Sequence, residues 1–173
     1  LYEVLIIEDN AEVLGFTEKI NKIEKGDKYT FFQNPYLIND YHLKDHQEEG
    51  VAWLQHLFKQ KASGCLLADD MGLGKTLQLL YFIDWHSRNY SQHNPYLVVA
   101  PISLLDNWEN EYTKFFKEPR LSITKLTSKD IPRQFDKRSI EYMQSLDIIL
   151  TNYESLRISQ LNFCAVQFDV IVL

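Results

Sequence analysis

The sequence predicts an α/β domain of three layers, in which a mainly parallel sheet is covered by helices on both faces. Two observations lead to this prediction. Short apolar runs of strand length alternate with longer segments whose apolar residues recur at helical spacing. A glycine-rich segment, residues 69–76, lies between one such run and one such helix. Strands joined through helices pair in parallel, so we expect both faces of the sheet to be buried.

The first part of the pattern consists of two helices and a strand between them. Residues 44–59 are amphipathic, with apolar side chains on one side of a helix. Residues 64–68 form a short apolar run that we expect to be a strand. From Thr76 onward, apolar residues again recur at helical spacing. The glycine-rich segment is therefore expected to lead from a strand into the N-terminus of a helix.

A further helix is predicted over residues 103–116. Ser103 is placed to cap its N-terminus, and Asp106 resembles the acidic member of a capping box. Trp108 is expected in the core rather than on a ligand, because it belongs to an apolar stripe with spacings of three and four. That stripe consists of Leu104, Leu105, Trp108, Tyr112 and Phe115.

The remaining elements continue the alternation of strands and helices. Together they predict βαβ units that build one parallel sheet. The expected strands are residues 96–100, 121–126, 147–151 and 168–173, and the expected helical segments are residues 137–145 and a short turn from Tyr153.

The glycine-rich segment carries the chemistry of a phosphate-binding loop. Gly72 and Gly74 let backbone N–H groups approach anionic oxygens at the positive end of the following helix. Lys75 would place a charge on the β and γ phosphates, and the Thr76 hydroxyl would bind Mg²⁺. The general pattern has glycine where this chain has Asp69. These residues predict a RecA-like P-loop (Walker A) domain that binds ATP and Mg²⁺ through Asp69, Asp70, Met71, Gly72, Leu73, Gly74, Lys75 and Thr76.

Composition limits the kinds of partner. The formal net charge of −6 argues against a broad basic face for nucleic acid, although backbone amides and a few side chains can still hold phosphates. Cys65 and Cys164 lie far apart and are expected to be buried thiols in a reducing compartment. No apolar run approaches the ~20 residues that cross a bilayer. We therefore expect a cytoplasmic or nuclear protein, or one of the nucleoid in a bacterium, without a membrane partner.

The chain is expected to be one domain with an N-terminal addition. Residues 41–173 form the predicted nucleotide-binding domain, and residues 1–40 an N-terminal extension or the end of a preceding domain. The sequence starts at Leu1 and stops at Leu173 within an apolar run, which indicates a segment of a longer protein. On this interpretation, the acidic Walker B box lies beyond the segment.

Five segments together resemble one family, the SWI/SNF-type ATPases, which form the chromatin-remodeller-like branch of helicase superfamily two. The helix start around Gln47 resembles the family's first motif together with the phosphate-binding loop. His46 departs from the pattern, because an aromatic residue, typically tyrosine, often precedes the glutamine. The resembling segments are residues 43–54, 68–76, 96–111, 150–156 and 168–173, of which the last resembles the strand that leads into the acidic box.

The resemblance implies the N-terminal lobe of a two-lobe, ATP-driven motor that steps along duplex DNA and remodels protein–DNA complexes. It implies a second RecA-like lobe in the same protein and protein partners on DNA. Without the acidic box and the second lobe, we expect residues 1–173 alone to bind nucleotide weakly and not to turn it over. The roles implied are adenine selection by Gln47, phosphate and metal binding by Lys75 and Thr76, and nucleic-acid backbone contact by Pro101, Ser103, Asn152 and Tyr153.

Two other functions share these features. A conventional DEAD/DEAH-type helicase that acts on RNA or single strands has the same fold and phosphate-binding loop. A nucleotide-switched protein-binding module would bind ATP without translocation, and it suits the acidic composition. For Asn152 and Tyr153, a helix cap and a packed ring remain an alternative to contact with nucleic acid.

Overall fold

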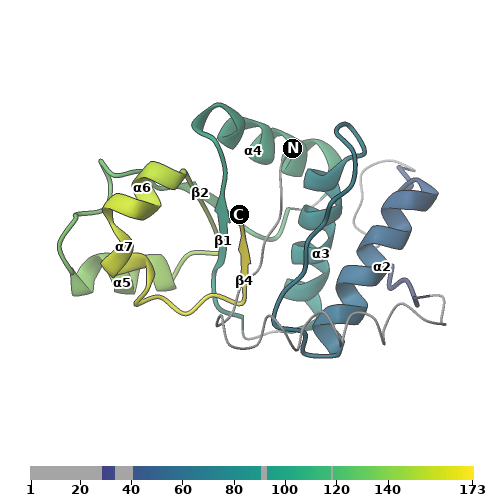
Figure 1. Ribbon diagram of the computed structural model, residues 1–173, viewed down its shortest axis with the longest axis horizontal. Helices are drawn as coiled ribbons and strands as arrows, with labels where there is room; N and C mark the ends of the chain where they lie inside the picture. The colour runs from purple at the N-terminus through teal and green to yellow at the C-terminus, as the bar shows by residue number, and fades with distance from the viewer. Residues whose placement is uncertain (1–28, 34–40, 91–92, 118) are drawn as a thin grey trace.

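The computed structural model describes residues 29–33, 41–90, 93–117 and 119–173. Its centre is a sheet of four parallel strands in the order β2-β3-β1-β4 (Figure 1). The parallel α/β prediction is therefore confirmed. The strands are β1 (Tyr96–Val99), β2 (Ile123–Lys125), β3 (Ile148–Thr151) and β4 (Val170–Val172).

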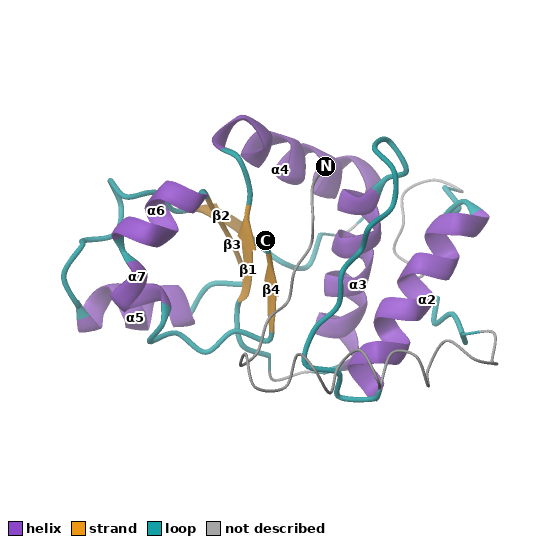
Figure 2. Ribbon diagram, viewed as in Figure 1, coloured by secondary structure: helices purple, strands orange, loops and turns teal. Residues whose placement is uncertain are grey.

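Helices cover both faces of the sheet, as the three-layer prediction requires. Figure 2 shows α2, α3 and α4 on one side of the strands and α5, α6 and α7 on the other. The predicted helices over 44–59, 103–116 and 137–145 are all present, each with slightly different ends. The helices are α2 (Asp45–Lys59), α3 (Lys75–Asn89), the 3-10 turn η1 (Ile102–Leu104), α4 (Leu105–Phe115), α5 (Lys137–Gln144), α6 (Tyr153–Ile158) and α7 (Gln160–Phe163).

The central strand β1 is apolar throughout because it faces a core on each side. Tyr96 and Val98 belong to the core under α2, α3 and α4, whereas Leu97 and Val99 belong to the core under α5 and α7. Successive side chains of a strand point to opposite faces, so a doubly covered strand needs apolar residues at every position. All four residues of β1 are buried.

A buried carboxylate joins α3 to α4 beneath the sheet. Asp84 of α3 is fully buried. The Tyr112 hydroxyl group on α4 donates a hydrogen bond to Asp84 Oδ1 at 3.0 Å. Arg88 pairs with Oδ2 of the same carboxylate at 2.7 Å. A buried charge is tolerated when it is paired and hydrogen-bonded, so this cluster fixes α4 relative to α3.

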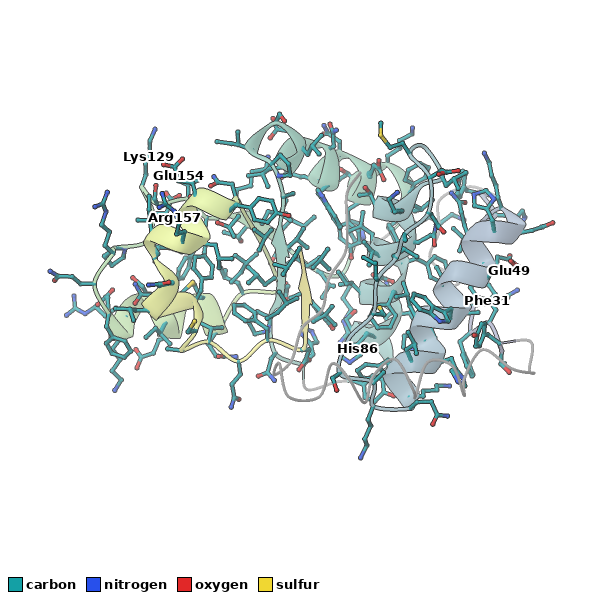
Figure 3. All side chains as sticks on the ribbon, in the orientation of Figure 1. Phe31, Glu49, His86, Lys129, Glu154 and Arg157 are labelled. Atoms are coloured by element: carbon teal, nitrogen blue, oxygen red, sulfur yellow. The ribbon has the colours of Figure 1, made fainter. Side chains whose placement is uncertain are left out.

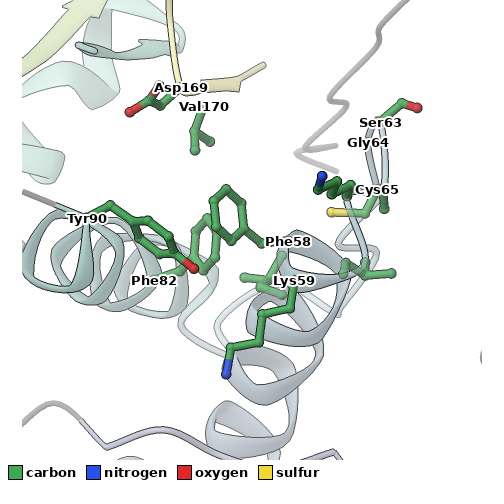
Figure 4. Close-up of a pocket in the computed structure, with 13 residues that line it drawn as sticks. Phe58, Lys59, Ser63, Gly64, Cys65, Phe82, Tyr90, Asp169 and Val170 are labelled. Carbon is green, nitrogen blue, oxygen red and sulfur yellow. The ribbon is translucent and has the colours of Figure 1, made fainter. Parts of the chain in front are cut away.

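The strand expected over residues 64–68 does not join the sheet. Within this run the structure describes a single bridge residue, Leu66, whose side chain is exposed while Cys65 and Leu67 are buried. A cavity of about 530 Å³ is lined by Cys65 on one side and Val170 of β4 on the other (Figure 4). Among the described residues, the run therefore contributes a single bridge rather than a strand of the sheet, whose order is β2-β3-β1-β4.

The predicted cap at Ser103 is wrong. Ser103 lies exposed in the 3-10 turn η1, and Leu104 occupies the N-cap position of α4 without a side-chain cap. Asp106 instead accepts a hydrogen bond from Lys125 of β2 at 2.6 Å, and Lys125 also binds Glu109. Pro101 fixes the backbone before η1, so the chain turns once before the α-helix begins.

The two thiols differ. Cys65 is buried, as predicted. Cys164 is exposed, so the prediction that both thiols are buried is wrong for Cys164. Cys164 follows α7, where the chain turns toward β4 at the surface. The buried side chains in this stretch are those of Phe163 and Val166, on either side of Cys164.

Most of the N-terminal addition, residues 1–28 and 34–40, lies outside the described residues. The described segment 29–33 packs on α2 and α3 (Figure 3). The Phe32 N–H donates to Gln55 Oε1 at 2.9 Å, and Gln55 Nε2 donates back to the Phe32 carbonyl at 3.0 Å. The Phe31 ring lies 5.6 Å from the ring of Tyr81.

Candidate nucleotide site

The phosphate-binding loop sits at the N-terminus of α3, at the edge of the sheet where β1 ends (Figure 1). Gly72 and Gly74 adopt left-handed backbone angles, with φ of 86° and 81°. Gly74 is the N-cap of α3, so the loop turns directly into the helix. Side chains other than glycine adopt this conformation only with strain, which explains both glycines.

Lys75 lies folded over the loop. Its ammonium group donates hydrogen bonds to the backbone carbonyls of Asp69 and Asp70, the latter at 3.2 Å. Both Lys75 and Thr76 are partly exposed at the start of α3. The ammonium group therefore stands within the turn of the loop, where the phosphates of a nucleotide would replace the two carbonyls as its partners.

Gln47 contacts the loop from α2. Its Nε2 donates to the Leu73 carbonyl at 3.2 Å, and its Oε1 accepts from the Lys44 N–H at 3.1 Å. The side chain is only 5% exposed. His46 Nε2 lies 3.3 Å from the same Leu73 carbonyl. The structure thus brings Gln47, the residue expected to select adenine, against the phosphate-binding loop, with its amide bonded to Leu73 and Lys44.

Gln78 is a contact of the loop that the sequence did not predict. It lies three residues after Lys75 on α3, is fully buried, and donates from Nε2 to Asp69 Oδ2 at 3.2 Å. A polar residue within the apolar stripe of this helix is the signal that points to it.

A cavity of about 360 Å³ lies beside the loop, at the carboxyl ends of β1 and β4. Loops at this edge of a parallel sheet are the usual place for ligands. Lys75 and Thr76 line the cavity together with Pro101 and Tyr153, so residues predicted from separate segments meet there. Trp108 is buried, as predicted, and it also lines the cavity.

Glu111 of α4 also lines this cavity, although the sequence did not predict it. Burial raises the pKa of its carboxyl group, and the charge of Lys114 opposes that shift. Its position three residues after Trp108 places both side chains on the same face of α4. That spacing is the signal that would have identified it.

The four residues predicted to contact nucleic acid lie at two neighbouring strand ends. Pro101 follows β1, and Ser103 is exposed in η1. Asn152 follows β3 and caps α6, because its Oδ1 accepts the Ser155 N–H at 2.9 Å. Tyr153 is 51% exposed at the cavity, so the alternative of a packed ring is not what the structure shows.

Among the described residues, no group of three or more His, Cys, Asp or Glu side chains is arranged to hold a metal ion. Thr76, the residue predicted to bind Mg²⁺ through its hydroxyl, lies at the start of α3 and lines the cavity.

None of the helices that the structure describes is long and apolar enough to cross a membrane.

Comparison with known proteins identifies the relatives of this arrangement. Residues 46–173 match the family described as the SNF2-related domain. The chain is 38% identical to the Zorya protein ZorD of Escherichia coli O139:H28 over 98% of its own length and 18% of that protein. It is 34% identical to the ISWI chromatin-remodeling complex ATPase ISW2 of Saccharomyces cerevisiae over 70% of this chain and 11% of that protein.

A solved structure shares the fold. The Sulfolobus solfataricus SWI2/SNF2 ATPase core in complex with double-stranded DNA matches with a TM-score of 0.51 and 33% identity, over 72% of this chain and 24% of that one. The chain therefore spans less than a quarter of the length of each of these three relatives.

Proposed function

Because this chain belongs to the SNF2-related domain family, we propose that it is the ATP-binding lobe of a DNA-dependent ATPase that translocates on duplex DNA and remodels protein–DNA complexes. The observation that carries the proposal is the phosphate-binding loop beside the cavity. Gly72, Gly74 and Lys75 stand there at the N-terminus of α3. This arrangement can hold the phosphates of a nucleotide through backbone N–H groups and one ammonium charge.

The proposed nucleotide is ATP bound with Mg²⁺. Lys75 would exchange its two carbonyl partners for phosphate oxygens, which form stronger, charge-assisted hydrogen bonds. The Thr76 hydroxyl fits one coordination position of Mg²⁺, an ion that takes its other ligands from phosphates and water. When bound, Mg²⁺ neutralises charge that develops on the transferred phosphoryl group.

Gln47 is proposed to select adenine. An amide has two N–H donors and two acceptor lone pairs, and the contacts to Leu73 and Lys44 use one of each. The remaining donor and acceptor match the donor and acceptor edge of adenine. The bond to Leu73 also means that any change at Gln47 acts on the phosphate-binding loop.

Nucleic acid is proposed to lie along the ends of β1 and β3. Pro101 and Ser103 at the first end, and Asn152 and Tyr153 at the second, would contact the backbone of one DNA strand. Ile102 is 70% exposed between the first two, so this edge is open to a large partner. Contacts to phosphates carry no sequence information, which predicts weak sequence preference.

The catalytic partners are proposed to come from the rest of the protein. Phosphoryl transfer to water needs a carboxylate that positions the water and cationic stabilisation of the transition state. In the family to which this chain belongs, an acidic box and a second RecA-like lobe are proposed to supply these groups. We further propose that the protein acts in the cytoplasm, nucleus or nucleoid, where DNA and its bound proteins are found.

The test is steady-state ATP hydrolysis by the full-length protein, alone and with duplex DNA, single-stranded DNA or RNA. The proposal predicts strong stimulation by duplex DNA that disappears in Lys75→Ala. Stimulation only by RNA or single strands would support the conventional helicase instead. Nucleotide binding without turnover would support the switch module.

A further inference from the structure

The side-chain amide of Gln78 lies between α2 and the first residue of the phosphate-binding loop. Its Nε2 donates to the Asp69 carboxylate at 3.2 Å, and the whole side chain is 0% exposed. Its Oε1 has no hydrogen-bond partner within the described part of the chain. Burying an amide that is only half satisfied is unfavourable, so the contact with Asp69 must outweigh a real cost at this position.

Asp69 is held at two atoms. Its carboxylate accepts from Gln78, and its backbone carbonyl accepts from the ammonium group of Lys75. The general phosphate-loop pattern has glycine here, which offers no side chain to hold. In this chain, the residue that begins the loop is therefore fixed from the helix that follows it.

The space for Gln78 is provided by a glycine on the neighbouring helix. A Cβ at Gly50 of α2 would overlap Oε1 of Gln78 and lie 3.0 Å from its Cδ. Any larger residue at position 50 would push the amide away from its present position. The absence of a side chain at Gly50 thus determines whether Gln78 reaches Asp69.

We propose that Gln78 is a positioning residue for ATP binding, which acts by holding Asp69 and with it the start of the phosphate-binding loop. This inference rests on the proposed function. When ATP binds, Lys75 leaves the Asp69 carbonyl for the phosphates, so one of the two restraints on Asp69 is lost. The Gln78 amide then keeps the loop in the conformation that presents its N–H groups to the nucleotide.

A double-mutant cycle on the full-length protein tests this role, with the dissociation constant for ATP and Mg²⁺ as the readout. Gln78→Ala and Asp69→Ala are each expected to weaken binding about tenfold, the value of one charge-assisted hydrogen bond. Because both remove the same contact, the double variant is expected to bind as each single variant does. An unchanged dissociation constant in Gln78→Ala, or additive losses in the double variant, would overturn the proposal.

Gln55→Ala is the matched control. Gln55 is a glutamine on α2 that is also 0% exposed, but its amide bonds to the Phe32 backbone rather than to the loop. Its loss is expected to lower stability and to leave the affinity for ATP unchanged. If Gln55→Ala weakened ATP binding as much as Gln78→Ala does, the loss would come from disturbed packing, and Gln78 would have no positioning role.

Hydrogen exchange of the loop amides without nucleotide separates this inference from the proposed function. Gln78→Ala is expected to speed exchange at residues 70–74, and Gln55→Ala is expected to leave it unchanged. A wild-type protein that binds no ATP would refute the proposed function, and the exchange experiment would then decide the positioning role alone. Equal exchange in wild type and Gln78→Ala would overturn that role.

Discussion

The side-chain amide of Gln47 donates a hydrogen bond to the backbone carbonyl of Leu73, 3.2 Å away, and so ties the start of α2 to the phosphate-binding loop. Gly74 makes this approach possible, because a Cβ there would overlap Gln47 Nε2 and lie 3.5 Å from its Cδ. The residue proposed to select adenine and the loop proposed to hold phosphate are therefore one connected structure.

Gln47→Ala tests both parts of this connection. We expect ATP to bind about tenfold more weakly, because the variant loses contacts to the loop and to adenine. The preference for ATP over GTP should also fall, since only the adenine contact distinguishes the bases. Competition titrations with both nucleotides provide the measurement. If the affinities for ATP and GTP fall by the same factor, Gln47 only supports the loop.

Gly50→Ala is expected to destabilise the protein, against the usual trend. In a helix interior, replacing glycine by alanine normally stabilises by about 1 kcal/mol. At Gly50 the added methyl group would strike the Gln78 amide, which we expect to cost about 1–3 kcal/mol. Urea unfolding of the two proteins measures the difference.

The control for Gly50→Ala is the same substitution in a Gln78→Ala background. With the amide removed, the methyl group has space and the ordinary helix preference should return. Gly50→Ala is then expected to stabilise rather than destabilise. An equal loss of stability in both backgrounds would mean that another contact opposes the methyl group.

Most predicted helices and strands agree with the observed ones, because apolar periodicity within each segment decides them. The helix expected over 44–59 is α2 with one residue fewer at its start, and the strand expected over 96–100 is β1. Apolar periodicity records which side of an element is buried, and that information lies within each segment. The glycines of the phosphate-binding loop were likewise predictable, because positive φ angles require them.

The errors concern contacts between distant segments. Residues 64–68 have the composition of a strand, but a strand also needs a neighbour, and sequence composition does not supply one. Asp106 was predicted as a capping residue, whereas Lys125, far along the chain, binds it. The contact of Gln78 with Asp69 depends on how α2 packs on α3 at Gly50, which no local pattern encodes.

We expect His86 to make the stability of the protein depend on pH. It lies buried at one end of α3 (Figure 3), where its Nδ1 is 2.7 Å from the Tyr96 hydroxyl. Burial lowers its pKa below the ordinary 6.5, with Asp169 opposing and His93 adding to the shift. Because the pKa of His86 is lower in the folded protein, the unfolded chain takes up the proton at a higher pH. The contribution of neutral His86 to the free energy of unfolding is therefore present above about pH 6.5 and is lost as the pH falls.

We therefore expect His86→Phe to flatten this dependence. The variant loses the hydrogen bond to Tyr96 and is less stable at neutral pH, but its free energy of unfolding should change less between about pH 7 and about pH 5. Urea unfolding at several pH values provides both curves. Parallel curves would show that His86 titrates alike in the folded and unfolded chain.

The two cysteines are expected to react at very different rates. Burial raises the pKa of the Cys65 thiol to about 12, so almost no thiolate is present at neutral pH. Cys164 is exposed and accessible to reagent. In the native protein, iodoacetamide should label residues 1–173 rapidly at Cys164. Cys164→Ser should abolish this rapid labelling, and Cys65→Ser should leave it unchanged. Rapid labelling of Cys65 in the native Cys164→Ser variant would show that the segment around Cys65 opens readily to solvent.

Calorimetric titration of the full-length protein with ATP and Mg²⁺, in wild type, Lys75→Ala and Lys129→Ala, shows whether this loop holds a nucleotide. Lys129 is an exposed lysine on the far side of the sheet, near α6 (Figure 3), and serves as the charge-matched control. We expect Lys75→Ala to weaken binding at least about a hundredfold, because it removes the cation that meets the phosphates, and Lys129→Ala to bind as wild type does. Equal affinity in wild type and Lys75→Ala would contradict a nucleotide site at this loop.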